Sequence, residues 1–258
     1  MNKKVIYTCL VGNYDALPQP EVIDESFDYI CFSDKVKEGK IGSWEMRTIP
    51  FAHNEQSCVS RYPKLLPHNV LAEYEYSVYI DANIQITHQS FYEAVNAKIT
   101  SDCIVAQVRH TLPPIDCTYD EISYAYKYER VSFWQAWRHI CYLRRNHFPC
   151  HFGLFENNLI LRKHNDELVK TLSIQWWDEY LRGPHRDQFS LMYVYWKNNF
   201  MPECLLGENE CARNSPWLKY NNHLWELQQE IPLTKRLKRY IHWYGYPIVK
   251  MIFSCSKI

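Results

Sequence analysis

The sequence predicts an α/β fold: one domain built on a mostly parallel central sheet that is flanked by helices. Two observations favour this fold class. Short apolar runs, each ended by a polar or glycine-containing turn, recur along the first half of the chain, and segments with helical spacing of apolar residues lie between them. Strands that alternate with helices are typical of a parallel sheet, and such sheets bind ligands at the carboxyl ends of their strands.

The expected elements follow in chain order. We expect strands at residues 5–11, 29–32, 44–49, 78–80, 103–108 and 158–161. We expect helices at residues 54–66 and 91–98, one or two within 119–147, one at 164–182, and one after the break at 183–188. We find neither an internal repeat nor a linker in the sequence, so these elements are expected to form a single domain.

Composition narrows the possible functions. The 258 residues contain 29 Lys and Arg and 29 Asp and Glu, so the overall charge gives no reason to expect a nucleic-acid partner. The ten cysteines include no Cys-x-x-Cys pair, which argues against a zinc ribbon or finger. Residues 1–4 lead directly into the first expected strand without a secretory leader, so we expect a cytoplasmic protein with reduced, mostly buried thiols.

The strongest local indication of chemistry is at residues 79–84, Tyr-Ile-Asp-Ala-Asn-Ile, where an apolar strand ends in two oxygen-bearing side chains. Positions i and i+2 of a strand face the same side, so Asp81 and Asn83 can act together. Carboxylate and carbonyl oxygens are the ligands preferred by Mg²⁺ and Mn²⁺, which often complete their shell with phosphates. The alternative is a strand that simply ends in a polar turn.

The last segment differs in composition from the rest. Residues 235–239 are Lys-Arg-Leu-Lys-Arg, and residues 240–253 are aromatic and apolar but interrupted by Gly245 and Pro247. No uninterrupted apolar run is long enough to cross a bilayer. Two interpretations stay open: a tail at 233–258 that lies in a membrane interface, or a helix packed on a domain at 1–232 with its basic side solvated.

Several motifs, in the same order along the chain, resemble those of a known family. They are Y-T-C-L-V-G-N-Y-D at 7–15, C-F-S-D at 31–34, S-R-Y-P-K-L-L-P-H at 60–68, Y-I-D-A-N-I at 79–84, E-N-N at 156–158 with Arg162, and R-D-Q at 186–188. The family comprises glycosyltransferase-like proteins of the plant mucilage and bacterial surface-polysaccharide type, formerly a domain of unknown function. It is similar to the metal-dependent GT-A transferases such as the glycogenin and LgtC groups. The resemblance covers roughly residues 5–195 and implies a GT-A-like domain.

The resemblance also implies roles for individual residues. Asp81 and Asn83 stand where the family binds Mn²⁺ or Mg²⁺ and, through it, the diphosphate of a nucleotide sugar. The residues expected to border the donor are Gly12, Asn13, Tyr14 and Asp34. Arg61 and Lys64, three residues apart on one helix face, are expected to meet phosphate charge, the alternative being a solvated basic face.

The late part of the chain supplies the remaining candidates. Asp187 and Gln188 match the family's Asp-Gln pair, and the alternative for Asp187 is a helix N-cap. His223 is the expected third metal ligand by its order in the chain, although a structural histidine is the simpler interpretation. His185 is expected to touch the diphosphate.

The reaction implied is transfer of a sugar from a nucleotide-diphospho-sugar, expected to be a UDP-sugar, to a cell-surface glycan or lipid-linked acceptor in bacterial polysaccharide or lipopolysaccharide synthesis. An inverting route would need a carboxylate base, for which Asp187 and Glu156 are the candidates, whereas a retaining route would not. The tail would then bring the enzyme to the inner face of the cytoplasmic membrane. A non-catalytic nucleotide- or carbohydrate-binding module is the main alternative. A nucleotidyltransferase ranks lower, because only Gly12 stands where such enzymes carry a glycine-rich loop.

Overall fold

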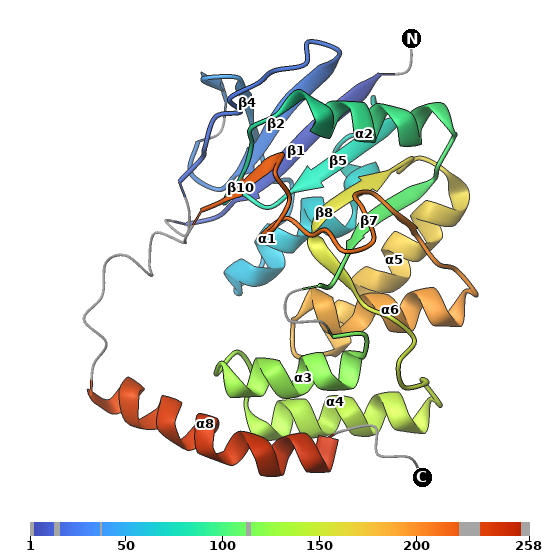
Figure 1. Cartoon of the computed structure of the whole chain (residues 1–258). Coiled ribbons are helices and arrows are strands. Elements are labelled where there is room, and N and C mark those ends of the chain that lie inside the picture. Colours follow the sequence, from blue (N-terminus) through green and yellow to red (C-terminus); the bar gives the residue numbers. More distant parts are fainter. Residues whose placement is uncertain (1–2, 13–15, 37, 112–114, 222–232, 254–258) are drawn as a thin grey trace.

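The computed structural model describes residues 3–12, 16–36, 38–111, 115–221 and 233–253. It shows a mixed α/β domain with a large central sheet between helices and a helix at its C-terminal end (Figure 1). The strands are β1 (Lys4–Leu10), β2 (Phe27–Ser33), β3 (Lys40–Ile41), β4 (Trp44–Thr48), β5 (Tyr76–Ile80), β6 (Ile84–Ile86), β7 (Val105–Arg109), β8 (Phe155–Arg162), β9 (Glu203–Cys204) and β10 (Leu218–Tyr220). The helices are α1 (Gln56–Leu65), the 3₁₀ turn η1 (Pro67–Asn69), α2 (Gln89–Thr100), α3 (Thr118–Lys127), α4 (Phe133–Arg145), α5 (Glu167–Arg182), α6 (Asp187–Lys197) and α8 (Leu233–Phe253).

The central sheet has eight strands in the order β3-β4-β2-β1-β5-β8-β7-β9. Strands β4, β2, β1 and β5 run parallel, which confirms the expected parallel core. Strand β8 is antiparallel to both of its neighbours, β5 and β7. A second small sheet pairs β10 with β6 just after the end of β5. The carboxyl ends of β1, β2 and β5 therefore meet at one edge, where the sequence predicts ligand binding.

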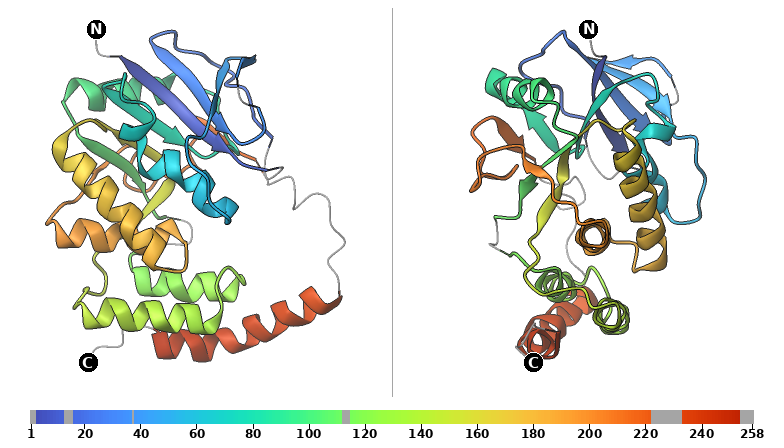
Figure 2. Two further views of the ribbon diagram at one scale, coloured as in Figure 1. Left: turned by 180° about the vertical axis from the view of Figure 1, so that it is seen from behind. Right: turned by 90° about the vertical axis from the view of Figure 1, so that its right-hand side faces the viewer.

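The core is divided by the sheet into two clusters, because alternate side chains of a strand face opposite sides. Tyr7 and Ile160 pack into the cluster that α1, α3, α4, α5 and α6 complete. Ile6 and Leu159 pack into the other cluster, which α2 covers. The views in Figure 2 show α2 on one face and α1 and α5 on the other. Both faces are thus buried, as the uninterrupted apolar strands predict.

Three helices, α3, α4 and α8, form a separate layer beyond the end of the sheet, which we call the helical layer. Helix α4 begins with a capping box in which the side chains of Ser132 and Gln135 each bond to the other's backbone N–H. Helix α8 lies against α3 and α4, with Phe253 stacked on Phe133 and fully buried (Figure 1). The segment 119–147 is therefore two helices. The proposed division of the chain at residue 232 stays a prediction.

One expectation about cysteine is wrong. Eight of the described cysteines are free thiols, and most of them are buried. Cys150 is disulfide-bonded, so the sequence-based expectation of reduced thiols fails at this position.

Candidate functional site

A cleft of about 1180 Å³ lies between the carboxyl edge of the sheet and the helical layer. One wall comes from the ends of β1 and β5, the start of β8 and the facing side of α1. The other wall comes from α3, the turn after it, and α8. Seven residues predicted from sequence line this cleft: Arg61, Lys64, Asp81, Asn83, Glu156, Asp187 and Gln188. The fold thus brings together predicted side chains from four separate segments: α1, the end of β5, β8 and α6.

The end of β5 presents Asp81 and Asn83 to the cleft. The Tyr79 hydroxyl donates a hydrogen bond of 2.8 Å to Oδ1 of Asp81, and about a third (34%) of the Asp81 side chain is exposed. Asn83 is buried, and its Nδ2 donates to the backbone oxygen of Asn221 at 3.0 Å. This bond directs the side-chain nitrogen away and leaves the carbonyl oxygen as the atom that could face a cation. Both side chains therefore lie at the cleft, and their role as metal ligands stays a prediction.

A buried lysine joins two carboxylates below the surface of the cleft. Nζ of Lys64, whose side chain is 2% exposed, lies 2.6 Å from Oδ2 of Asp187 and 3.6 Å from Oδ1 of Asp81. Nε of Arg61 lies 3.4 Å from the same oxygen of Asp187. Burial acts to raise the pKa of Asp187, but Lys64 and Arg61 outweigh it and hold that pKa well below the usual range. Asp187 is therefore ionised and is shared between two cations.

Arg162 holds the backbone from which the Lys64 side chain extends. Its Nη2 donates to the Tyr7 hydroxyl at 2.6 Å and to the backbone oxygen of Lys64 at 2.5 Å. These bonds join β8, β1 and the end of α1 in the buried interior. The geometry makes Arg162 a positioning residue that directs Lys64 toward the cleft.

Glu156 at the start of β8 is also fully bonded. Oε1 lies 2.9 Å from Nη1 of Arg213, and Oε2 accepts from Nδ2 of Asn158 at 2.7 Å. Burial raises the pKa of Glu156, and nearby Asp81 adds to this effect against the opposing charge of Arg213. Two buried atoms beside it, Oδ1 of Asn158 and Nδ2 of Asn157, have no hydrogen-bond partner within the described structure. Such atoms favour a ligand with hydroxyl groups, because unsatisfied buried polar atoms are costly.

Other predicted residues lie outside the cleft lining. The backbone N–H of Gly12 donates to Oδ1 of Asp34 at 3.0 Å, so Asp34 ties together the loops that follow β1 and β2. Nδ1 of His185 lies 2.5 Å from Glu55 and 3.7 Å from Sγ of Cys58, and its Nε2 faces the backbone oxygen of Leu181. Both ring nitrogens of His185 are thus engaged. The side chains of His185, Glu55 and Cys58 are nevertheless close enough together to be considered as metal ligands. The predicted residues Asn13, Tyr14 and His223 lie outside the described residues.

The helix-cap interpretation of Asp187 is wrong. Asp187 is the first residue of α6, and the cap position belongs to Arg186. Asp187 points instead to Lys64, as described above. Gln188, the other member of the pair, donates from Nε2 to the backbone oxygen of Phe155 and so joins α6 to β8.

Sequence reasoning missed part of the cleft lining. The charged and aromatic lining residues that were not predicted are His110, Glu121, Lys127, Tyr128, Arg130, Arg213, Tyr220, Arg239 and Trp243. Arg186 also lines the cleft, and it was part of a predicted motif but was assigned no role. Most belong to α3, α8 and the loops before β10, where no local pattern distinguishes a cleft residue from a solvated one. Only the position of Arg186 beside Asp187 offered an indication.

Comparisons with known proteins identify a family for this chain. A family model described as TOD1/MUCI70, glycosyltransferase-like domain, matches residues 1–223. No curated protein sequence matches significantly. The apo structure of WbbM, a bifunctional glycosyltransferase, aligns with a TM-score of 0.43 and 8% identity over 99% of this chain, which spans 50% of that structure's length. Apo mouse xyloside xylosyltransferase 1 aligns with a TM-score of 0.44 and 9% identity, covering 86% of this chain and 97% of that one.

Proposed function

Because the chain belongs to the TOD1/MUCI70 family of glycosyltransferase-like proteins, we propose that it transfers a sugar from a nucleotide-diphospho-sugar to a glycan or lipid-linked acceptor. The observation that carries this proposal is the cleft, in which Asp81, Asn83, Lys64 and Arg61 converge at the carboxyl ends of the parallel strands. Departure of a diphosphate develops negative charge, and preorganised cations and hydrogen-bond donors stabilise such charge most effectively.

A divalent cation fits the residues at the end of β5. The carboxylate of Asp81 and the amide oxygen of Asn83 are hard ligands suited to Mg²⁺ or Mn²⁺. Tyr79 occupies one oxygen of Asp81, and the partly exposed side chain still faces the cleft. When bound, the ion would neutralise the diphosphate as it leaves. The amide at Asn83 gives the ion less negative charge than a second carboxylate would.

The chain's own cations divide into two roles. Lys64 is buried and already paired, so we assign it to holding Asp81 and Asp187 in place rather than to direct contact with phosphate. Arg61 has 34% of its side chain exposed and keeps donors for an oxyanion. This changes the expectation that both Arg61 and Lys64 would meet phosphate charge.

The two candidate bases are not equivalent. A general base works best when its pKa lies near the working pH. The strongly lowered pKa of Asp187 makes it a weak base, whereas burial raises the pKa of Glu156. We therefore favour Glu156 if the reaction inverts configuration. The unpaired amide atoms of Asn157 and Asn158 would bind sugar hydroxyls beside it.

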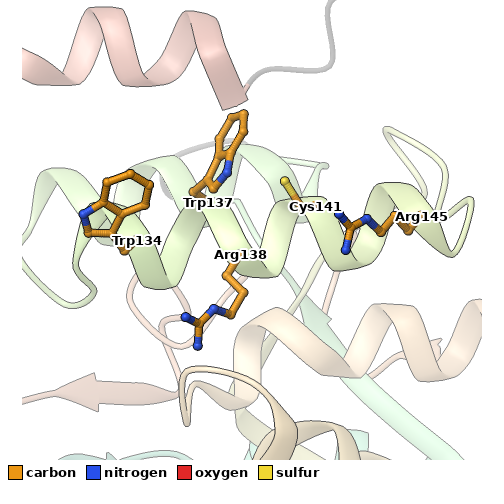
Figure 3. A pocket seen from close by; sticks show the side chains of 5 residues that line it. All are labelled: Trp134, Trp137, Arg138, Cys141 and Arg145. Atoms are coloured by element: carbon orange, nitrogen blue, oxygen red, sulfur yellow. The ribbon is translucent and has the colours of Figure 1, made fainter.

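We also propose that the helical layer rests on an anionic membrane. In addition to Trp243, which lines the cleft, eight large apolar side chains of α8 are exposed: Leu233, Leu237, Tyr240, Ile241, Tyr244, Ile248, Met251 and Ile252. Helix α4 adds Trp134 and Trp137, which line a groove of about 350 Å³ with Arg138 and Arg145 (Figure 3). No described helix is long and apolar enough to span a bilayer. Exposed tryptophans beside arginines suit an interfacial position on anionic lipid.

Vesicle sedimentation tests the membrane contact. The protein should sediment with vesicles that contain phosphatidylglycerol, and Ile248→Asp, at a side chain 60% exposed on α8, should weaken that binding. Ile174→Asp is the matched control, because Ile174 is 48% exposed but lies on α5. Equal binding by both variants, or none by the wild type, would contradict the contact.

The nucleotide site is tested by calorimetry with UDP in the presence and absence of Mn²⁺. Wild type should bind UDP in a metal-dependent way, and Asp81→Ala should lose that dependence. Asp178→Ala, at an exposed carboxylate on α5, is the matched control. Binding of UDP without metal dependence would favour the non-catalytic alternative, and absence of UDP binding would require other nucleoside diphosphates to be tested.

A further inference from the structure

The second wall of the cleft carries charge that the donor site does not use. Lys127, Tyr128 and Arg130 come from the end of α3 and the turn after it, and Arg239 and Trp243 come from α8. In Figure 1 these elements lie across from the end of β5. This wall therefore faces whatever molecule lies beyond the donor sugar.

The cleft as a whole is cationic, although the chain has no net charge. The cations in its lining are Arg61, Lys64, Lys127, Arg130, Arg186, Arg213 and Arg239, and the carboxylates are Asp81, Glu121, Glu156 and Asp187. Ion pairs occupy Arg61, Lys64 and Arg213. Within the described part of the chain, no ion pair involves the other four cations.

Arg186 gives the most direct indication of a missing anion. Its Nε is buried and has no hydrogen-bond partner in the described structure. Burial, and then the positive charge of Arg130, lower the pKa of Arg186, although the carboxylates of Asp187 and Glu121 act in the opposite direction. Neither carboxylate forms an ion pair with Arg186 in the described structure. A buried guanidinium whose Nε has no partner is costly unless a bound anion pairs with it.

Aromatic rings accompany these cations. Nζ of Lys127 lies 3.8 Å from the centre of the Trp243 ring and 4.9 Å from that of Tyr246. Tyr128 and Trp243 pack edge to face at 6.5 Å, and each is about half exposed, 54% and 53%. Amphipathic rings at a wet cleft offer an apolar surface on which the face of a sugar ring can lie.

We propose that this wall is the acceptor subsite and that it selects an anionic saccharide. The sugar would lie against Tyr128 and Trp243, and its phosphate or carboxylate would be held by Arg130 and Arg186. Lys127 and Arg239 add positive charge at the opening. The proposal rests on the proposed glycosyltransferase function and names its acceptor class.

Ligand-observed NMR tests the subsite with simple probes, with UDP and Mn²⁺ present to fill the donor site. Methyl glucoside 6-phosphate and methyl glucuronide should bind, each more tightly than neutral methyl glucoside. Tighter binding of the phosphate probe would indicate a phosphorylated acceptor, and tighter binding of the glucuronide would indicate a uronic acid. Arg130→Gln and Arg186→Gln should each weaken the charged probe by about tenfold to a hundredfold, the contribution of a charge-assisted hydrogen bond. Arg145→Gln on α4 is the control and should match wild type.

The outcomes separate this proposal from the one on which it rests. Equal binding of neutral and charged probes would overturn the subsite. Binding of the charged probe that is seen without UDP but lost once UDP and Mn²⁺ are present would also overturn it, because the anion would then occupy the donor phosphate position. Arg130 is exposed, so Arg130→Gln should fold. That variant still tests the subsite even if Arg186→Gln fails to fold. If UDP does not bind at all, the choice of UDP as the donor fails and other nucleoside diphosphates are tested, while the probes alone still test the anion site.

Discussion

The ion pair between Lys64 and Asp187 allows the sharpest test of how the site is built. Their charged atoms lie 2.6 Å apart, and the two side chains are 2% and 9% exposed. We consider Lys64→Met and Asp187→Asn, which remove one charge each with little change in size, and the double variant. Removing one member of a buried pair leaves the other charge uncompensated, whereas removing both does not.

The magnitude follows from the remaining contacts. Loss of one partner of a buried ion pair costs about 3–5 kcal/mol. In Lys64→Met, Asp187 keeps Arg61 at 3.4 Å, so the lower end of that range applies. About 3 kcal/mol corresponds to a fall of roughly 6–12 °C in the melting temperature for a chain of this size. The double variant should cost about as much as one single variant, which gives a coupling energy of roughly 3 kcal/mol.

Thermal and denaturant unfolding of the four proteins supply the measurement. Additive costs in the double variant, or single variants within about 0.5 kcal/mol of wild type, would refute the buried-pair reasoning. Acid provides an independent check. The pKa of Asp187 is held below its ordinary value of 3.8, so its stabilisation is present above that pH and is lost as pH falls below it. The difference between wild type and Asp187→Asn should therefore shrink below about pH 4.

Three further predictions follow. Asn83→Asp adds a buried carboxylate beside Asp81, so Mn²⁺ should raise its melting temperature more than that of wild type; an equal rise would argue against a metal site there. Burial lowers the pKa of His139 and of His164 from 6.5 to about 4. Between these two pH values the unfolded chain therefore binds more protons than the folded chain does. The free energy of unfolding should fall by about 3 kcal/mol per histidine between pH 6.5 and 4, and a flat profile by denaturant titration would contradict this. Gly12 has φ +69°, so Gly12→Ala should cost about 1–2 kcal/mol; Gly207→Ala, at a glycine without positive φ, should cost less.

Local patterns predicted most of the fold. The apolar run before Asp81 is β5, whose five residues are all buried, and the segment that carries Arg61 and Lys64 is α1. The short strands β3, β6, β9 and β10 were not predicted. They contain two or three residues each, too few for a period to be visible. The direction of β8 could not be predicted either, because its antiparallel pairing with β5 depends on the path of the chain between the two strands.

The sequence by itself determined the α/β class, the position of the oxygen-bearing side chains of Asp81 and Asn83 at a strand end, and the helix that carries Arg61 and Lys64. These follow from neighbouring residues, whose spacing decides which side chains share a face. Only the tertiary structure decided that Lys64 would pair with Asp187, that His185 would pair with Glu55, and that Arg186 would lie near Arg130 and Glu121 without forming an ion pair in the described structure. Such partners are distant in sequence, and their charges interact only after folding has brought them together and removed the water that would otherwise screen them.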